Sequence, residues 1–197
     1  MRFYFSAMCL FISAGLITAA SAHGNSELVG AAQARLKTDI RYDASYTALD
    51  YPGGDVAPDV GVCTDVIIRS YRAAFGFDFQ KAVHEDMRED FSAYPNRWGL
   101  KRPDKNIDHR RVPNLETYLK RQGASRPLSK KLSDYKAGDI LTFRLGGSLP
   151  HIGIVSNKRS RAGTPLIIHN VGAGPKEEDV LWAYQLYGHY RFFPEGN

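Results

Sequence analysis

The chain has little cysteine. Of its 197 residues, two are cysteines, Cys9 and Cys63. Cys9 lies in an N-terminal apolar stretch that we expect to be removed, which leaves Cys63 as the one thiol of the mature chain. An intramolecular disulfide is then impossible. A lone thiol kept in an oxidising compartment is open to damage, and its presence indicates that it is used.

Long apolar runs are also missing. The run from Ala7 to Ala19 is shorter than the ~20 residues that a transmembrane helix needs. It precedes Ala20-Ser21-Ala22, which has the small-x-small form of a signal-peptidase site. We therefore predict a signal peptide at residues 1–22, cut after Ala22, with an uncleaved anchor as the alternative. Residues 23–197 are long enough for a single domain, which we expect to be periplasmic or secreted, with no stable membrane insertion after cleavage.

Charge of one sign is not concentrated anywhere in the chain. The 26 Lys and Arg residues exceed the 21 Asp and Glu residues and give a formal net charge of +5, but they are spread along the sequence. A nucleic-acid partner usually requires a basic run or patch, and export also argues against one. Acidic material of the cell envelope is the better match for this charge balance.

Apolar residues recur at helical spacing in the first part of the remaining chain and at every second residue in its C-terminal third. Helical spacing predicts an opening helix marked by Leu28, Ala32, Leu36 and Ile40, followed by helices at 63–75, 79–91 and 114–122. Alternation in the C-terminal third predicts strands at 139–145, 151–155, 166–171 and 188–193. Helices first and strands after predict an α+β fold, with N-terminal helices packed on a C-terminal antiparallel sheet.

Cys63 stands at the start of the helix predicted for 63–75. A thiol there feels the positive end of the helix dipole, which favours the thiolate. With an imidazole nearby, we expect its pKa to fall below the ~8.5 of a free cysteine. The alternative interpretation is a small buried apolar side chain without chemistry.

Two histidines lie on neighbouring predicted strands. A turn centred on Ser160 would place His151 opposite His169, and a slip of one residue would place Asn170 there instead. Cys63, His151 and His169 then supply a nucleophile, a base and a group that orients the base, which is the set required for thiol-based acyl transfer. Asn170 is the alternative third catalytic residue.

A long connection at residues 92–113 lacks a helical or strand period. It contains aromatic residues and the cluster Asp108-His109-Arg110-Arg111. Loops of this length in a compact domain are often functional. Arg110 or Arg111 would clamp a substrate carboxylate through two parallel hydrogen bonds, or else the cluster would attach the loop to the core through ion pairs.

Several separated motifs carry a resemblance to a known clan. Tyr51-x-Gly53-Gly54 precedes Cys63, and Lys136-Ala137-Gly138-Asp139-Ile140-Leu141 leads to His151-Ile152-Gly153-Ile154-Val155. These motifs resemble the papain-like cell-wall cysteine peptidases of the NlpC type and the related CHAP amidases. The chain is also similar to an uncharacterised family of exported bacterial proteins in that clan. The signature of that family runs through Val62-Cys63-Thr64-Asp65, Ile107 to Asn114, His169-Asn170 and Gly188 to Arg191.

The resemblance implies a papain-like, NlpC-type fold with Cys63, His151 and His169 as the catalytic residues. It also marks a set of candidate substrate-binding residues: Tyr51, Asp65, Asp108, His109, Arg110 and Arg111. In one respect the chain departs from the pattern. NlpC-type enzymes usually carry Asp-Cys-Ser, whose Asp and Ser bind the free amine of the stem peptide, whereas this chain has Val62, Cys63 and Thr64. Asp65 either supplies the lost charge or stabilises the helix start.

We therefore predict an exported thiol hydrolase that cleaves a peptide or amide bond in peptidoglycan stem peptides. The expected partner is peptidoglycan or its peptide fragments, and we expect no cofactor and no metal. The alternative is a non-catalytic module of the same fold that binds murein or a protein. A zinc site made of Cys63, His151 and His169 ranks last, because the three positions include no closely spaced ligand pair.

Overall fold

The computed structural model describes residues 13–194. Its helices are α1 (Ser13–Ala34), α2 (Cys63–Phe75), α3 (Phe79–Glu89) and α4 (Val112–Arg121), with short 3-10 turns η1 (Arg35–Lys37), η2 (Phe91–Ala93), η3 (Asp108–Arg110) and η4 (Leu132–Asp134). Its strands are β1 (Arg41–Tyr42), β2 (Val60–Gly61), β3 (Ile140–Leu145), β4 (Leu149–Arg159), β5 (Pro165–Asn170), β6 (Pro175–Glu178) and β7 (Gln185–Tyr190). None of the helices in this part of the chain has the length and hydropathy that a membrane crossing requires.

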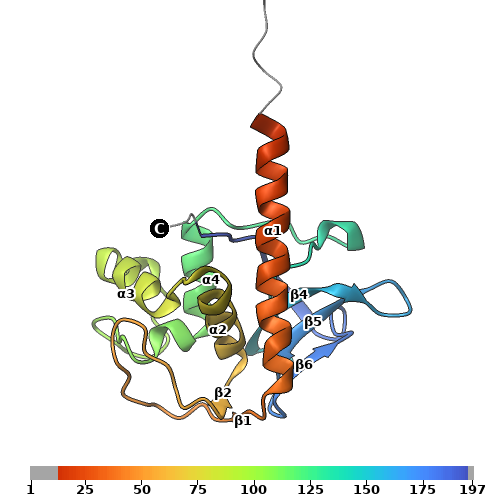
Figure 1. Cartoon of the computed structure of the whole chain (residues 1–197). Helices are drawn as coiled ribbons and strands as arrows, with labels where there is room; N and C mark the ends of the chain where they lie inside the picture. Colours follow the sequence, from red (N-terminus) through yellow and green to blue (C-terminus); the bar gives the residue numbers. More distant parts are fainter. Residues whose placement is uncertain (1–12, 195–197) are drawn as a thin grey trace, which may run out of the picture.

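Five strands form one antiparallel sheet in the order β6-β5-β4-β3-β7. Figure 1 shows α2, α3 and α4 together on one side of the molecule and β4, β5 and β6 on the other, with α1 running between the two groups. Helices α1 and α2 both pack against β4. The predicted α+β class, with helices before an antiparallel sheet, is therefore confirmed.

Strand alternation gives the sheet two apolar faces. Ile152, Ile154 and Ile168 face the helices and join the main core, which also contains Cys63. Val155 and Ile167 face the other way and join a smaller cluster. Because neighbouring residues on a strand point to opposite faces, this division decides on which side each histidine of β4 and β5 must lie.

Most of the predicted elements are present, but the opening helix differs, and the short strands β1 and β2 were not predicted. The helix α2 ends as expected at Gly76, whose φ of 65° is the left-handed conformation that glycine adopts most easily. The opening helix ends at Ala34 rather than continuing to Ile40. It also runs through the predicted cleavage position after Ala22, while residues 1–12 of the predicted signal peptide lie outside the described residues. Strand β6 was not predicted at all.

Candidate active site

Cys63 is the first residue of α2. The backbone N–H of Val62, which precedes the helix, donates to the Asp65 carboxylate (Oδ2) at 2.6 Å. A carboxylate in the first turn satisfies an unpaired N–H group and complements the helix dipole. The start of α2 is therefore fixed by Asp65, and with it the position of the Cys63 side chain.

The sulfur of Cys63 is enclosed by protein. Burial raises the pKa of the thiol to about 12, and the nearby Asp65 carboxylate acts in the same direction. The N–H groups of Ile152, Thr64 and Cys63 itself point at the sulfur and oppose this shift. The expected pKa below ~8.5 is wrong for this closed arrangement, because loss of hydration outweighs the helix dipole and the N–H groups.

His151 and His169 are in direct contact. Nε2 of His151 lies 3.0 Å from Nδ1 of His169, and both rings are buried. The predicted contact is confirmed, but the predicted register is wrong by two residues, because Gly153 rather than His151 is paired with His169. The turn is centred near Ala162 rather than Ser160, because Arg159 pairs with Pro165, and the register shift between Val155 and Arg159 reduces the resulting offset to two residues. A shift of two residues keeps both side chains on the same face, so the contact survives.

The histidine pair and the thiol approach the start of β4 from different sides. The His151 ring packs with Phe143 and Tyr184 of the smaller cluster, with ring centroids 6.3 Å apart in each case. Cys63 reaches the strand at the peptide group between His151 and Ile152, whose N–H faces the sulfur. Among the described residues, no hydrogen bond joins the Cys63 sulfur to a ring nitrogen of His151. The thiol is thus in contact with the backbone next to His151 and makes no hydrogen bond with its ring in this state.

Glu178 extends the histidine pair and was missed by the sequence analysis. Its Oε2 lies 3.2 Å from Nε2 of His169. It stands on β6, opposite Ile167 and diagonal to His169, so it shares the face of the two rings. The segment Pro175–Glu178 contains a proline and three charged residues, which is untypical of a strand but common in edge strands. That composition is the signal that could have located it.

The Glu178 carboxylate lies at ion-pair distance from Nε2 of His169, although the geometry forms no hydrogen bond there. We assign the proton of His169 to Nε2, because an N–H group beside a carboxylate is favourable, and Nδ1 is then the acceptor. Nε2 of His151 must then carry the proton that lies between the two rings. This leaves Nδ1 of His151 with a lone pair, which is the state that a general base requires.

Both rings are uncharged at neutral pH. Burial, with a smaller contribution from His169, lowers the pKa of His151 to about 3. Burial also lowers the pKa of His169, although the Glu178 carboxylate opposes that shift. Together with the raised pKa of Cys63, this makes the resting state a neutral thiol and two neutral imidazoles.

A family model described as Domain of unknown function (DUF1287) matches residues 29–192. The chain belongs to the DUF1287 family. The match includes Cys63, His151, His169 and Glu178, so the whole arrangement lies inside the DUF1287 domain. Its relatives include an Escherichia coli (strain K12) protein, "Uncharacterized protein YijF", which is 53% identical over 172 residues, covering 87% of this chain and 83% of the relative.

A solved structure, that of NlpC1 from Trichomonas vaginalis, aligns with 87% of this chain and 45% of its own. The sequence identity is 14% and the TM-score is 0.47. This chain therefore spans less than half the length of that protein.

Asp65 and Arg110, two predicted substrate-binding residues, bind each other. Nε and Nη2 of Arg110 lie 3.0 Å and 2.9 Å from the two carboxylate oxygens of Asp65, and both side chains are buried. Thr64 donates to the carbonyl oxygen of Arg110 at 3.1 Å. These contacts attach η3 to the start of α2, and the guanidinium of Arg110 faces Asp65 rather than an open site.

Asp108 and Arg111 form a second pair, which holds the long connection. Nη1 of Arg111 lies 2.9 Å from Oδ1 of Asp108, and the backbone N–H of Asp104 donates to Oδ2 at 2.5 Å. The guanidinium of Arg111 also stacks on Trp98, 4.1 Å from the ring centroid. Of the two roles considered for this cluster, the contacts favour attachment of the loop for both arginines.

The remaining predicted residues lie in other surroundings. Tyr51 contacts His84, with ring centroids 5.1 Å apart, and His109 is buried with no partner on Nδ1. Asn170 faces away from the histidine pair and donates to the carbonyl oxygen of Gly61 at 3.4 Å. The structure thus groups His151 and His169 with Glu178 rather than with Asn170. Within residues 13–194, no group of three His, Cys, Asp or Glu side chains has an arrangement that could hold a metal ion.

Proposed function

We propose that this DUF1287 protein is a thiol hydrolase that cleaves a peptide or amide bond, with Cys63 as nucleophile and His151 as base. The observation that carries the proposal is the chain of contacts Glu178–His169–His151, which ends on β4 next to Ile152, the residue whose N–H faces the sulfur of Cys63. The pair of buried imidazoles is held in place by its own 3.0 Å contact and by the carboxylate of Glu178. A base activates a nucleophile when it comes within hydrogen-bond distance of it, so His151 and Cys63 would have to move together when substrate binds.

The chemistry follows from the neutral resting state. As the sulfur attacks the carbonyl carbon, the thiol proton moves to Nδ1 of His151, and the N–H groups around the sulfur can stabilise the oxygen that becomes negative. The tetrahedral intermediate collapses to a thioester as His151 returns the proton to the leaving amine. Water then attacks the thioester, again with His151 as base, and releases the acid and the thiol.

Proton transfer must accompany attack, because a preformed thiolate–imidazolium pair is unfavourable here. With the thiol pKa near 12 and the His151 pKa near 3, separating the charges before attack would cost most of the barrier. The Cys63 side chain is 6% exposed, so the substrate has to displace part of its covering. Hydration or substrate contacts at that moment would bring the two pKa values closer together.

The proposed substrate is a stem peptide of peptidoglycan, and the proposed location is the periplasm or the cell exterior. Support for both comes from the motifs around Cys63 and His151 and from the N-terminal apolar run followed by Ala20-Ser21-Ala22. The carboxylate of Asp65 is paired with Arg110, so it is not available to bind the free amine of a stem peptide. A bond farther from a free amino terminus is therefore the better candidate.

The test is mass analysis of purified muropeptides after incubation with the wild-type protein and with Cys63→Ala. If the protein is a hydrolase, the wild type alone should form two fragments whose masses add up to the mass of the parent muropeptide plus one water. A second candidate, a binding module of the same fold, is favoured by the closed and neutral state of Cys63. Retention of muropeptides by both proteins without any new fragment would establish that candidate instead.

A further inference from the structure

We propose that the connection between α3 and η3 forms a binding site for a ligand that carries an oxyanion next to a small apolar or aromatic group. Two cavities meet there at Leu100, one apolar with a volume of 310 Å³ and one cationic with a volume of 640 Å³. Cys63, His151 and His169 line neither of them. The proposal is therefore independent of the proposed hydrolase activity.

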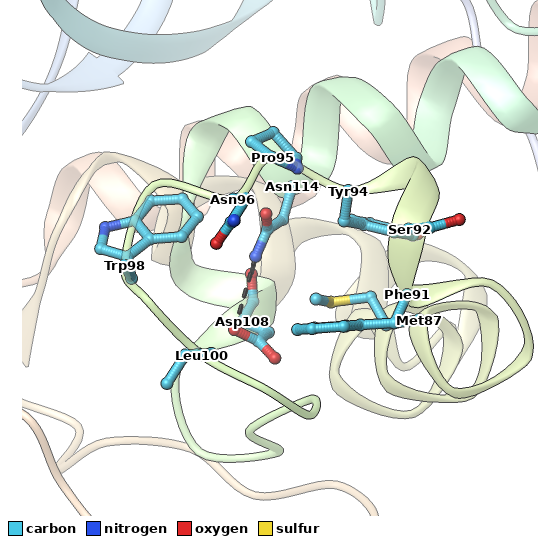
Figure 2. A pocket seen from close by; sticks show the side chains of 10 residues that line it. All are labelled: Met87, Phe91, Ser92, Tyr94, Pro95, Asn96, Trp98, Leu100, Asp108 and Asn114. Carbon is cyan, nitrogen blue, oxygen red and sulfur yellow. Dashed lines mark hydrogen bonds between the residues drawn. The ribbon is translucent and has the colours of Figure 1, made fainter.

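The apolar cavity lies between the end of α3 and the connection that follows it. Figure 2 shows Met87 and Phe91 on one side and Trp98 and Leu100 on the other, with Asp108 between them. The stacking of Arg111 on Trp98 and the contacts of Asp108 hold this wall in place. Its volume is at the lower end of the ~300–1,000 Å³ of small-molecule sites, and a single ring would occupy it.

The second cavity carries an excess of positive charge. Arg88, Arg102 and Lys105 line it, and among the described residues none of the three has an ion-pair partner. The one carboxylate in its wall, that of Asp104, already accepts hydrogen bonds from the Asn106 N–H at 2.9 Å and the Tyr46 hydroxyl at 3.1 Å. All three side chains are exposed, and Nζ of Lys105 lies 5.7 Å from the centroid of the Tyr51 ring. Cations that line one cavity without a carboxylate paired to them favour an anion there.

Burial and the positive charge around this cavity lower the pKa of His84, which lines it. Burial lowers its pKa, and the charges of Arg88 and Lys105 lower it further, while Asp108 and Glu85 act in the opposite direction. Its Nδ1 is buried and has no hydrogen-bond partner. Since this nitrogen is shielded from the cavity, His84 contributes an uncharged ring to the wall and not a polar contact with the ligand.

The two cavities together define the class of ligand. Arginine binds phosphate and carboxylate through paired N–H groups, which places the oxyanion beside Arg88 and Arg102. Because Leu100 lines both cavities, a ligand of modest size can place its oxyanion in one and its ring in the other. Phosphate and carboxylate share the recognition chemistry, and the experiment below distinguishes them.

The experiment uses phenyl phosphate as the probe and Cys63→Ala as the background, so that hydrolysis plays no part. The chain has two tryptophans, and the indole N–H signal of Trp98 reports on the apolar cavity while that of Trp182 serves as the internal reference. We expect a saturable shift of the Trp98 signal. Three further ligands separate the contributions: benzoate replaces the phosphate with a carboxylate, inorganic phosphate lacks the ring, and phenol lacks the charge. We expect inorganic phosphate and phenol to bind more weakly than the tighter-binding of phenyl phosphate and benzoate.

Charge removal provides the control. Arg88→Gln and Arg102→Gln should each weaken binding about tenfold, because each removes a charge-assisted hydrogen bond. Arg161→Gln removes the same charge from the turn between β4 and β5 and should leave the affinity unchanged. The proposal is overturned if no probe gives a saturable shift, if phenol binds as tightly as the anions, or if Arg161→Gln weakens binding as much as the other two.

Discussion

Cys63 is subject to two opposing influences. The start of α2 and three N–H groups favour the thiolate, whereas burial favours the thiol, and burial prevails. Sequence identifies the first influence, because a helix start can be recognised from spacing. It does not identify the second, because the covering of the sulfur depends on segments from β4 and from the chain before α2. The position of Cys63 at a helix start could be predicted, but its protonation state could not.

Alkylation of Cys63 by iodoacetamide should therefore be slow at neutral pH. The rate depends on the thiolate fraction, so with a pKa of about 12 it should still be rising at pH 9 and above. Unfolding the protein in denaturant should accelerate the reaction at pH 7 and return the midpoint to ~8.5. A native midpoint below 8.5 would show that the sulfur is more hydrated in solution than in the structure.

Glu178→Gln should lower kcat by about 10-fold to 100-fold while KM stays the same, because Glu178 acts on His169 and does not touch the substrate. Loss of the carboxylate also removes the influence that raises the His169 pKa, so the acid side of the pH profile should move. Glu177→Gln is the matched control. Glu177 lies opposite Ile168, on the other face of β6, and bonds to Gln33 of α1 at 3.0 Å. Equal losses for the two variants would mean that β6 is merely structural.

The elements differ in how far their sequences determine them. The helices α2, α3 and α4 follow from apolar spacing and from Gly76 and Gly123, which lie just past α2 and α4. The hairpin of β4 and β5 was predicted, but its bulge was not, because a bulge depends on twist and on the fit to neighbouring strands. The prediction that the two histidine side chains lie on the same face of the sheet was nevertheless confirmed, because a shift by an even number of residues does not change the face.

The contacts of η3 should stabilise the fold by attaching the long connection to the start of α2. Arg110→Ala leaves the buried carboxylate of Asp65 without its partner, and removal of one member of a buried ion pair costs about 3 kcal/mol or more. We expect a large fall in the midpoint of urea unfolding.

Arg41→Ala is the control. The Arg41 side chain is largely exposed, so its ion pair with Asp43 should contribute little to the free energy of unfolding. An Arg110→Ala protein with wild-type stability and weaker substrate binding would instead restore the role of a carboxylate clamp.

The whole molecule should lose stability as the pH falls below neutrality. Burial lowers the pKa of His109 to about 4 and that of His151 to about 3, against ~6.5 in the unfolded chain. The unfolded chain then binds more protons, so stability is lost as the pH falls through ~6.5 and continues to fall until the folded values are reached.

His109→Gln isolates one part of this effect. Between pH 7 and pH 5, the wild type should lose about 2 kcal/mol more than the variant, since one pKa unit corresponds to about 1.4 kcal/mol. Urea unfolding at the two pH values measures the difference. Parallel losses in the two proteins would mean that His109 is hydrated or bonded in solution.

At the level of the whole chain, the sequence predicted the fold class and the contact between His151 and His169, while the catalytic roles of Cys63, His151 and His169 stay predictions. It did not reveal Glu178, because that residue reaches the site only through a short edge strand with an untypical composition. It also did not show that Asp65 and Arg110 would face each other, since their pairing joins segments that are distant in the sequence. Contacts between distant segments are the part that spacing rules cannot supply.

The central claim is that Cys63 attacks a carbonyl and forms a thioester. Intact-protein mass spectrometry during turnover of muropeptides tests it most directly, with Glu178→Gln included because slower turnover lets the intermediate accumulate. The account predicts an added mass equal to the acyl part of the substrate, which maps to Cys63 after proteolysis and is absent in Cys63→Ala. Hydrolysis that continues in Cys63→Ala, or an adduct on another residue, would contradict it.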